Sequence, residues 1–293
     1  MTHAAGAHAA PGLLVTPARL ARWLRDEAQT GRELPLLIDG RPAADFAAGH
    51  LPGSVHIDLW GVSLIDTDPA PLRAFLWMVH HVLEQRGVRE DRPVVLVDQQ
   101  SGLRAARAFW FLEFFGHRRV SVLDGGVDAW VRDGFPLSTA AEQAVTAAWT
   151  EAHRPELLAT WRDVLDRVRA RDALPLDGVP ADVVLLDTRS DDEYTGHLVR
   201  ARRGGTIPGS VHVEWTRNLA PDGTFLPLPA LRALYESAGV TPDREVITYC
   251  QGAYRAAHSY IALRLLGYPR VRVYLGSWKE WSDREETPVE IPR

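Results

Sequence analysis

The sequence predicts an α/β fold made of two tandem copies, each with a central, mainly parallel sheet flanked by helices. Three observations lead to this prediction. The chain has 293 residues, which suits about two domains, because single cores seldom grow past roughly 200 residues. The same motifs occur in the same order in both halves. Within each half, short apolar runs rich in β-branched residues alternate with segments of helical periodicity, as in parallel sheets with crossover helices.

The duplication is visible first in a segment that ends in Pro-Gly-Ser-Val-His. Residues 36–57 read LLIDGRPAADFAAGHLPGSVHI, and residues 185–213 read LLDTRSDDEYTGHLVRARRGGTIPGSVHV. Both segments run from an apolar stretch to an aspartate, Asp39 or Asp187, then to Gly-His and on to the shared five residues. A duplication of this length indicates two homologous domains rather than a short solenoid repeat.

A second pair of segments aligns without a gap. Residues 94–117 read VVLVDQQSGLRAARAFWFLEFFGH, and residues 246–268 read VITYCQGAYRAAHSYIALRLLGY. The alignment pairs Gln99 with Cys250, Arg104 with Arg255, Gly116 with Gly267, Gly125 with Gly276 and Trp130 with Trp281. Because His56 and His212, like the two tryptophans, occur in both copies, we interpret these four side chains as structural.

Each copy is expected to contain a strand, loop, helix and strand in that order. The runs 94–97 and 246–249 are typical of buried strands. Apolar residues then recur at helical spacing, and Gly116 or Gly267 closes each helix. Further apolar runs, 120–123 and 271–275, return as parallel strands.

The domain organisation follows from these elements. We expect an N-terminal domain over residues 12–137 and a C-terminal domain over residues 156–293. The intervening residues 138–155 show no sustained period, end near a proline and are interpreted as the linker. The first twelve residues, MTHAAGAHAAPG, are small and polar and are expected to form a disordered tail.

Composition excludes several classes of function. A net charge of −5 with mixed signs provides no basic surface for nucleic acid. No apolar run approaches the ~20 residues that span a bilayer. The single cysteine permits no internal disulfide and no thiolate-rich metal site, and it favours a cytoplasmic setting.

Cys250 lies where a strand gives way to a helix, at the carboxyl edge of the predicted sheet. Ligands gather at this edge in parallel α/β units. Unpaired amides of a tight loop that opens a helix form a concave site for negative charge, and such a site stabilises a thiolate nucleophile. Gly252 gives the loop backbone freedom and Arg255 adds a permanent cation. Free cysteines are often simple packing residues, but this placement favours a nucleophile.

These residues resemble the tandem-domain rhodanese family, whose members transfer sulfane sulfur through a cysteine persulfide. The resemblance covers about residues 12–290 and depends on DTR at 187–189, the IPGSVH segment, the loop CQGAYR and GSWKEW at 276–281. It implies two rhodanese-like domains, of which the first is inactive and the second catalytic. It implies Cys250 as catalytic residue and a substrate-binding set of Arg189, Gln251, Gly252, Ala253, Tyr254 and Arg255. It implies no metal and no cofactor, with a small anionic sulfur donor and a thiophilic acceptor as partners.

Several alternatives stay open. The loop matches neither the basic loops of animal thiosulfate enzymes nor the CGSGVT type of 3-mercaptopyruvate enzymes, so the donor is thiosulfate or 3-mercaptopyruvate. A noncatalytic, sulfur-carrying module is a further alternative. A cysteine phosphatase is disfavoured, because four residues separate Cys250 from Arg255 where such an enzyme has five.

Individual side chains have alternatives as well. Arg189 is either a donor-binding residue or the partner of an acidic residue within 191–193. Tyr254 either lines the mouth of the pocket or simply packs. The inserted arginines Arg200, Arg202 and Arg203 either face an anionic substrate or solvate a surface loop.

Overall fold

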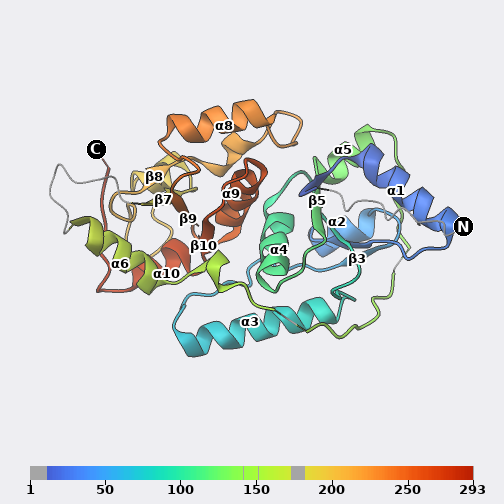
Figure 1. The fold of residues 1–293 in the computed structure, drawn as a ribbon, viewed down its shortest axis with the longest axis horizontal. Helices are drawn as coiled ribbons and strands as arrows, with labels where there is room; N and C mark the ends of the chain where they lie inside the picture. Colours follow the sequence, from blue (N-terminus) through green and yellow to red (C-terminus); the bar gives the residue numbers. More distant parts are fainter. Residues whose placement is uncertain (1–11, 141, 151, 173–181, 293) are drawn as a thin grey trace, which may run out of the picture.

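Two domains of the same topology make up the molecule (Figure 1). The computed structural model describes residues 12–140, 142–150, 152–172 and 182–292, so nearly all of the expected N-terminal tail lies outside the described residues. Each domain holds a five-stranded sheet. Every strand pairing in both sheets is parallel. The predicted α/β fold with two parallel sheets is confirmed.

The strand orders of the two sheets are equivalent. The first sheet has the order β1-β5-β4-β2-β3 and the second the order β6-β10-β9-β7-β8. The strands of the first are β1 (Leu14–Val15), β2 (Leu36–Asp39), β3 (Ser54–His56), β4 (Val94–Val97) and β5 (Val120–Leu123). The strands of the second are β6 (Leu158–Ala159), β7 (Val183–Asp187), β8 (Val211–His212), β9 (Glu245–Tyr249) and β10 (Val271–Tyr274).

Helices cover both faces of each sheet (Figure 1). The first half contains α1 (Pro17–Thr30), α2 (Ala43–Ala48), α3 (Pro69–Glu84), α4 (Leu103–Phe114) and α5 (Gly126–Arg132). The second half contains η1 (Pro155–Leu157), α6 (Trp161–Asp172), α7 (Asp191–Tyr194), η2 (Trp215–Asn218), α8 (Leu228–Ser237), α9 (Tyr254–Leu265) and α10 (Ser277–Asp283).

The central strands β4 and β9 lead into the two loops that contain Gln99 and Cys250. Both strands are covered on two faces, which explains why their sequences are nearly continuous apolar runs. The helix that follows each strand ends as predicted at a glycine in the left-handed region, with φ of 90° at Gly116 and 81° at Gly267. The two loops after β4 and β9 are therefore presented in the same way by the two domains.

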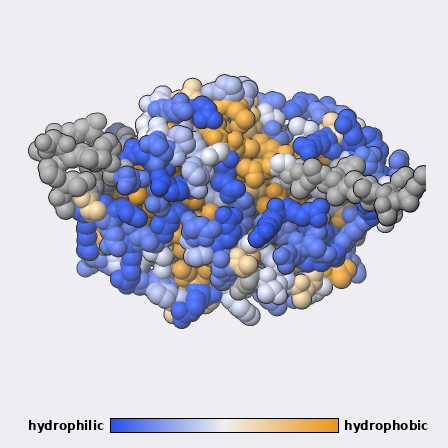
Figure 2. Space-filling view, viewed as in Figure 1, coloured by the Kyte–Doolittle hydropathy of each residue, from blue (hydrophilic) through white to orange (hydrophobic). Residues whose placement is uncertain are grey.

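The two domains pack through equivalent helices. α4 and α9 lie against each other at the centre of the molecule (Figure 1). Tyr260 on α9 donates a hydrogen bond of 2.6 Å to Glu113 on α4, and one cluster of buried apolar residues extends through both domains. On the face seen in Figure 2, apolar residues gather toward the middle, over this boundary. The shared core fixes the two loops relative to each other.

The segment between the domains packs on the first of them. In its described part, residues 139–154 contain no helix or strand. Trp149 is buried, and the backbone amides of Ala147 and Trp149 donate to Glu84 at the end of α3. The boundaries 12–137, 138–155 and 156–293 stay predictions, because the segment is a part of the first domain's surface as well as a connection.

The inserted arginines differ in their surroundings. The guanidinium of Arg203 donates to backbone carbonyls of residues 281–287, so it anchors the C-terminal segment. Arg202 pairs with Glu285 at 3.0 Å. Arg200 is 58% exposed and lies near Glu193. Arg202 is equally exposed, at 58%, but it lies against the C-terminal segment, whereas Arg200 lies beside the carboxylate that binds Arg255.

Candidate active site

Cys250 follows β9 directly and begins the loop that leads into α9. Its side chain is 1% exposed. Ala253 precedes α9 with a φ of 69°, a left-handed conformation that is unusual for a residue with a side chain. This turn folds the four residues between β9 and α9 into a compact loop that leads into the helix.

Ser277 at the start of α10 fixes this loop through hydrogen bonds. Its hydroxyl accepts hydrogen bonds from the amides of Cys250 and Ala253, at 3.2 and 3.1 Å, and donates to the carbonyl of Tyr274 at 2.8 Å. The carbonyl of Cys250 in turn accepts from the amide of Trp278 at 2.8 Å. The loop is therefore fixed by the next strand-to-helix junction of the same sheet.

The remaining loop amides are left free. Those of Gln251, Gly252, Tyr254 and Arg255 donate to no other described residue. They precede or begin a helix of 12 residues, whose N-terminus carries a partial positive charge. An arrangement of this kind stabilises an anion placed at the loop.

Arg255 is held beside the cysteine by Glu193. Its two terminal nitrogens bind the two carboxylate oxygens of Glu193 at 2.5 and 3.0 Å. Burial opposes ionisation of Glu193, but the bond to Arg255 and its positive charge lower the pKa of Glu193 to about 2. Burial also lowers the pKa of Arg255, and this is outweighed by Glu193 and by the nearby thiolate of Cys250, which raise it. The pair keeps a cation next to Cys250 at all ordinary pH values.

Arg189 is buried, and most of its guanidinium donors have hydrogen-bond partners. Its Nε and Nη2 bind the carboxylate of Asp187, and Nη2 also donates to the carbonyl of Gly205 at 2.7 Å. The acidic partner is therefore Asp187 and not one of residues 191–193. Nη1 has no partner among the described residues. In the first domain the equivalent Arg41 binds Asp39 in the same way, and its Nη1 donates to Gln99, which stands where the second domain has Cys250.

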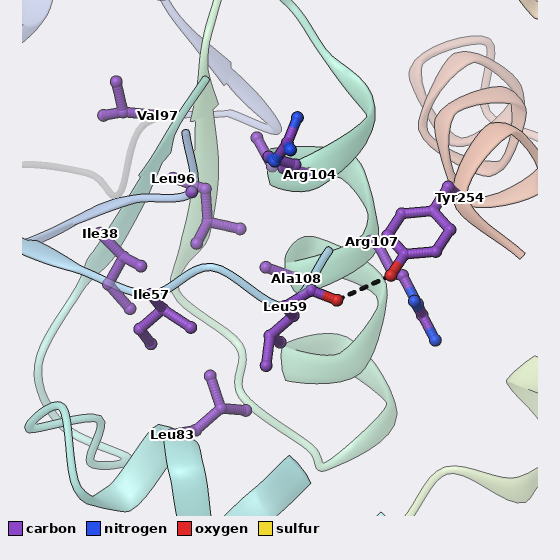
Figure 3. A pocket seen from close by; sticks show the side chains of 12 residues that line it. Ile38, Ile57, Leu59, Leu83, Leu96, Val97, Arg104, Arg107, Ala108 and Tyr254 are labelled. Carbon is purple, nitrogen blue, oxygen red and sulfur yellow. Dashed lines mark hydrogen bonds between the residues drawn. The ribbon is translucent and has the colours of Figure 1, made fainter. Parts of the chain in front are cut away.

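The first domain covers the loop that begins at Cys250. The hydroxyl of Tyr254 donates to the carbonyl of Leu59 at 2.7 Å, and a side chain added at Gly252 would lie 3.2 Å from the hydroxyl of Ser63. Gln251 instead contacts the second domain's own insertion, at the carbonyl of Arg200. Tyr254 thus lines a cavity at the domain boundary, with Arg104 and Arg107 of α4 (Figure 3).

Comparison with known proteins agrees with this duplicated arrangement. The model of the rhodanese-like domain matches the chain twice, at residues 18–133 and 175–284. The chain belongs to the rhodanese-like family. The chain is 34% identical to the sulfur carrier protein TtuD of Thermus thermophilus over 279 residues, which are 91% of this chain and 94% of the relative.

Other rhodanese-like relatives are named for a transfer activity. The chain is 34% identical to a thiosulfate sulfurtransferase of Azotobacter vinelandii, covering 87% of this chain and 91% of the relative. It is 32% identical to a thiosulfate sulfurtransferase of Pseudomonas aeruginosa, covering 95% and 97%. These relatives show sulfur transfer at the level of the family.

Solved structures agree on the fold. The anaerobic ergothioneine biosynthesis enzyme of Chlorobium limicola, in complex with trimethyl histidine, superimposes with a TM-score of 0.78. It is 22% identical, and the match covers 96% of this chain and 70% of that chain. At this identity the likeness concerns the arrangement of the two rhodanese-like domains alone.

The first rhodanese-like domain has a loop of the same shape but with different occupants. Its Gln99 side chain is held between Arg41 and Asp128. The carboxylate of Asp98 turns into the loop and accepts hydrogen bonds from the amides of Gln99, Arg104 and Ala105. The site that the second domain leaves open for an anion is filled in the first by one of its own side chains.

Three residues near the site were missed by the sequence analysis. Ser277 lies within the GSWKEW segment, but neither its role nor that of Arg107 could be predicted, because both depend on which parts of the chain meet after folding. Glu193 did give one, since Ser190 and Glu193 form the Ser-x-x-Glu pattern of a capping box, which the structure contains. Its second role, binding Arg255, is a tertiary contact.

Among the described residues, no helix is long and apolar enough to cross a membrane.

Proposed function

We propose that this chain transfers the sulfane sulfur of thiosulfate to a thiophilic acceptor such as cyanide, through a persulfide on Cys250. The observation that carries the proposal is the open anion site around Cys250: free loop amides at the start of α9 and a fixed cation, Arg255. The chain's only cysteine stands there. The equivalent site of the first domain is filled by Asp98, which supports a single reaction centre per chain.

The first half-reaction forms the persulfide. The Cys250 thiolate attacks the outer sulfur of thiosulfate, a new S–S bond forms, and the S–S bond of the donor breaks. Sulfite leaves with the bonding electron pair. Three negative charges stand on each side, because the thiolate and the thiosulfate dianion become a persulfide anion and a sulfite dianion.

The second half-reaction discharges the sulfur. Cyanide attacks the outer sulfur of the persulfide, and thiocyanate leaves while the Cys250 thiolate is restored. In both steps the negative charge stays at the loop, so fixed amides and cations aimed at it lower the barrier without reorganisation. The protein's own groups supply all the chemistry that these steps require, and the proposal includes no metal and no cofactor.

The loop residues have separate roles in this proposal. The amides of Gln251, Gly252, Tyr254 and Arg255 hold the terminal sulfur, and Ala253 provides the left-handed turn that aligns them. The side chain of Arg255 holds the anionic donor beside Cys250. By analogy with Arg41, whose Nη1 donates to Gln99, we propose that the Nη1 of Arg189 binds the donor beside Cys250. A cytoplasmic setting belongs to the same proposal, because the thiol has to stay reduced.

Two alternatives have support of their own. In the first, the donor is 3-mercaptopyruvate, which stays open because the sequence of the loop matches neither the thiosulfate type nor the 3-mercaptopyruvate type. In the second, the protein carries sulfur to a protein acceptor, and the 34% identical relative named a sulfur carrier protein favours this reading. Both keep Cys250 as the residue that bears the sulfur.

A paired measurement tests the proposal. The wild-type protein and Cys250→Ser are incubated with thiosulfate or 3-mercaptopyruvate, intact masses are recorded, and thiocyanate formation from cyanide is measured. We expect one added sulfur per wild-type chain with thiosulfate, faster thiocyanate formation than with 3-mercaptopyruvate, and neither signal in the folded serine variant. Sulfur retained by the serine variant would disprove the role of Cys250. A persulfide formed without appreciable turnover to cyanide identifies the carrier alternative.

A further inference from the structure

Arg107 is a buried cation whose guanidinium lies over the rings of Phe111 and Tyr254 but has no hydrogen-bond or ion-pair partner among the described residues. It lies on α4 of the first domain and is 2% exposed. All three of its guanidinium nitrogens are buried, and none has a hydrogen-bond partner. No carboxylate among the described residues lies within ion-pair distance of it. The other fully buried arginine of comparable burial, Arg189, is bound to Asp187.

An arrangement of this kind is costly for the fold. Burying a charge without a hydrogen-bond or ion-pair partner has a large desolvation cost, and buried charges are normally paired. The nearest candidate acid on the same helix, Glu113, is already bound by Tyr260 and Arg264. A residue that costs stability in the unliganded protein is expected where an anion arrives during function.

Arg107 faces the catalytic loop across the domain boundary. Its guanidinium lies 4.0 Å from the centre of the ring of Tyr254, the first residue of α9, and the two side chains meet between α4 and α9 in Figure 3. Burial lowers the pKa of Arg107, whereas the negative charges of Tyr254 and Cys250, when ionised, act in the opposite direction. Arg107 is therefore close enough to Cys250 to feel its charge.

The internal duplication offers a comparison for this contact. In the second domain the position equivalent to Arg107 is His258 on α9, which reaches across the boundary in the opposite direction and contacts the carbonyl of Ser101 in the inactive loop at 2.9 Å. Each domain thus sends a basic side chain to the loop of the other. The one that reaches the inactive loop is satisfied there, and the one that reaches the catalytic loop is not.

We propose that Arg107 is a donor-binding residue which the inactive domain contributes to the active site, where it holds the anionic oxygens of the sulfur donor. The inference rests on the proposed function and adds a third arginine to Arg189 and Arg255. The substrate class that fits is a small sulfur oxyanion with at least two oxygens, such as the sulfonate end of thiosulfate, because a guanidinium binds two such oxygens by parallel hydrogen bonds. The fully buried position explains why an arginine is required, since its charge survives burial better than that of lysine.

Two variants test Arg107, with a matched control. Arg107→Met keeps the length and removes the charge, and Arg107→Lys keeps the charge without the planar fork. His258→Gln is the control, because it changes the equivalent contact at the inactive loop. We expect Arg107→Met to raise KM for thiosulfate roughly ten- to a hundredfold, Arg107→Lys to have a smaller effect, and His258→Gln to leave KM unchanged. Discharge of a preformed persulfide to cyanide should change little in all three.

The melting temperature distinguishes a donor-binding arginine from a structural one, because the two predict opposite changes when Arg107 is replaced. Replacing an unpaired buried charge by an apolar side chain of similar volume relieves desolvation, so Arg107→Met should melt at the wild-type temperature or above it. An arginine that simply holds the domains together would lower the melting temperature when removed. Arg107→Met with a lower melting temperature and an unchanged KM overturns the proposal and leaves an arginine satisfied by internal water alone.

Equilibrium binding separates this inference from the proposed function. In a Cys250→Ser background, which cannot turn over, calorimetric titration with thiosulfate and with sulfite should detect binding that Arg107→Met weakens at least tenfold. If the wild-type protein forms no persulfide but this binding and its loss are observed, the proposed function is wrong and the anion site stands. If persulfide forms and Arg107→Met binds both anions as well as its parent, the inference fails alone.

Discussion

The loops after β4 and β9 have the same backbone position in two copies of one fold, yet only one of them is open to an anion. In the loop that begins at Cys250, two amides are fixed by Ser277, while those of Gln251, Gly252, Tyr254 and Arg255 donate to no described residue. In the first domain's loop, the carboxylate of Asp98 accepts from three amides. A β-carbon added at Gly102 would lie 2.3 Å from this carboxylate, so Asp98 fills the centre of the loop.

The comparison shows that the first domain departs from the second by two changes and not one. Replacement of the cysteine by Gln99 removes the nucleophile, and Asp98 occupies the anion site that would stabilise it. Burial raises the pKa of Asp98, and the hydrogen bonds from the three amides offset only part of this rise. The first domain keeps the same strand, loop and helix as the second, and this helix, α4, carries Arg107.

The largest expected effect is the creation of a second reactive site. In a Cys250→Ser background, Gln99→Cys alone should take up no sulfur, because Asp98 fills the loop and repels an anion. Adding Asp98→Ala should open the amides and allow one sulfur per chain after incubation with thiosulfate. Intact-mass measurement reads the result directly. The Asp98→Ala variant that keeps Gln99 is the control and should stay unmodified. Equal uptake with and without Asp98 would show that the carboxylate is not the obstacle.

The next effect in size concerns the buried arginine near each loop, Arg189 in the second domain and Arg41 in the first. Arg189 and Arg41 have the same burial and the same aspartate partner, so Arg189→Lys and Arg41→Lys should cost similar stability. Only Arg189→Lys should impair donor use, by about 1.5–3 kcal/mol, or roughly ten- to a hundredfold in kcat/KM. Arg189→Ala should impair it further, but it also leaves Asp187 buried without its partner.

The two half-reactions distinguish the roles of Arg189. Donor use should fall while transfer from a preformed persulfide to cyanide changes little. If both half-reactions fall together, or if Arg41→Lys reduces kcat/KM as much as Arg189→Lys does, the arginine is structural and the donor is held elsewhere.

A smaller effect is expected from the pair that exists in the second domain alone. Arg255 is bound by Glu193, whereas its equivalent Arg104 meets Asp58 at 3.4 Å and stacks on Trp60. The pKa of Glu193 is lowered to about 2 from 4.5. Its contribution to stability is therefore present above pH 4.5 and is lost as the pH falls from 4.5 toward 2. Glu193→Gln should be less stable at neutral pH and lose less of its stability over this acid range.

Melting temperatures at pH 7, 5, 4 and 3 measure this difference. Glu236→Gln on α8 is a suitable control, because Glu236 is 44% exposed and pairs with Arg232 at the surface, where ion pairs contribute little. The Glu193→Gln variant should also lose activity severalfold, since Arg255 is no longer held beside Cys250. Parallel acid profiles for Glu193→Gln and the wild type would contradict the assignment.

Much of this comparison could be predicted from the sequence, and its deciding features could not. The duplication, the strand and helix around Cys250 and the glycines that close α4 and α9 follow from local patterns. The alignment placed Asp98 opposite Tyr249, but no local pattern states that Asp98 turns into the loop while Tyr249 points to Thr206. The isolation of Arg107 depends equally on how two helices far apart in the chain meet.

The smallest expected effect tests whether the first domain's loop takes part in the chemistry at all. The side chain of Gln99 is held by Arg41 and Asp128 at the surface of its own domain, and it forms no hydrogen bond with a described residue of the loop that begins at Cys250. Gln99→Ala should therefore leave turnover nearly unchanged and remove only two side-chain hydrogen bonds, each worth about 1 kcal/mol of stability. Steady-state kinetics with thiosulfate measure the outcome. A fall of more than about tenfold, equivalent to roughly 1.4 kcal/mol of barrier, would mean that the loop itself, and not Arg107 alone, forms part of the active site. The conclusion that only the loop of the second domain takes part in the reaction would then be wrong.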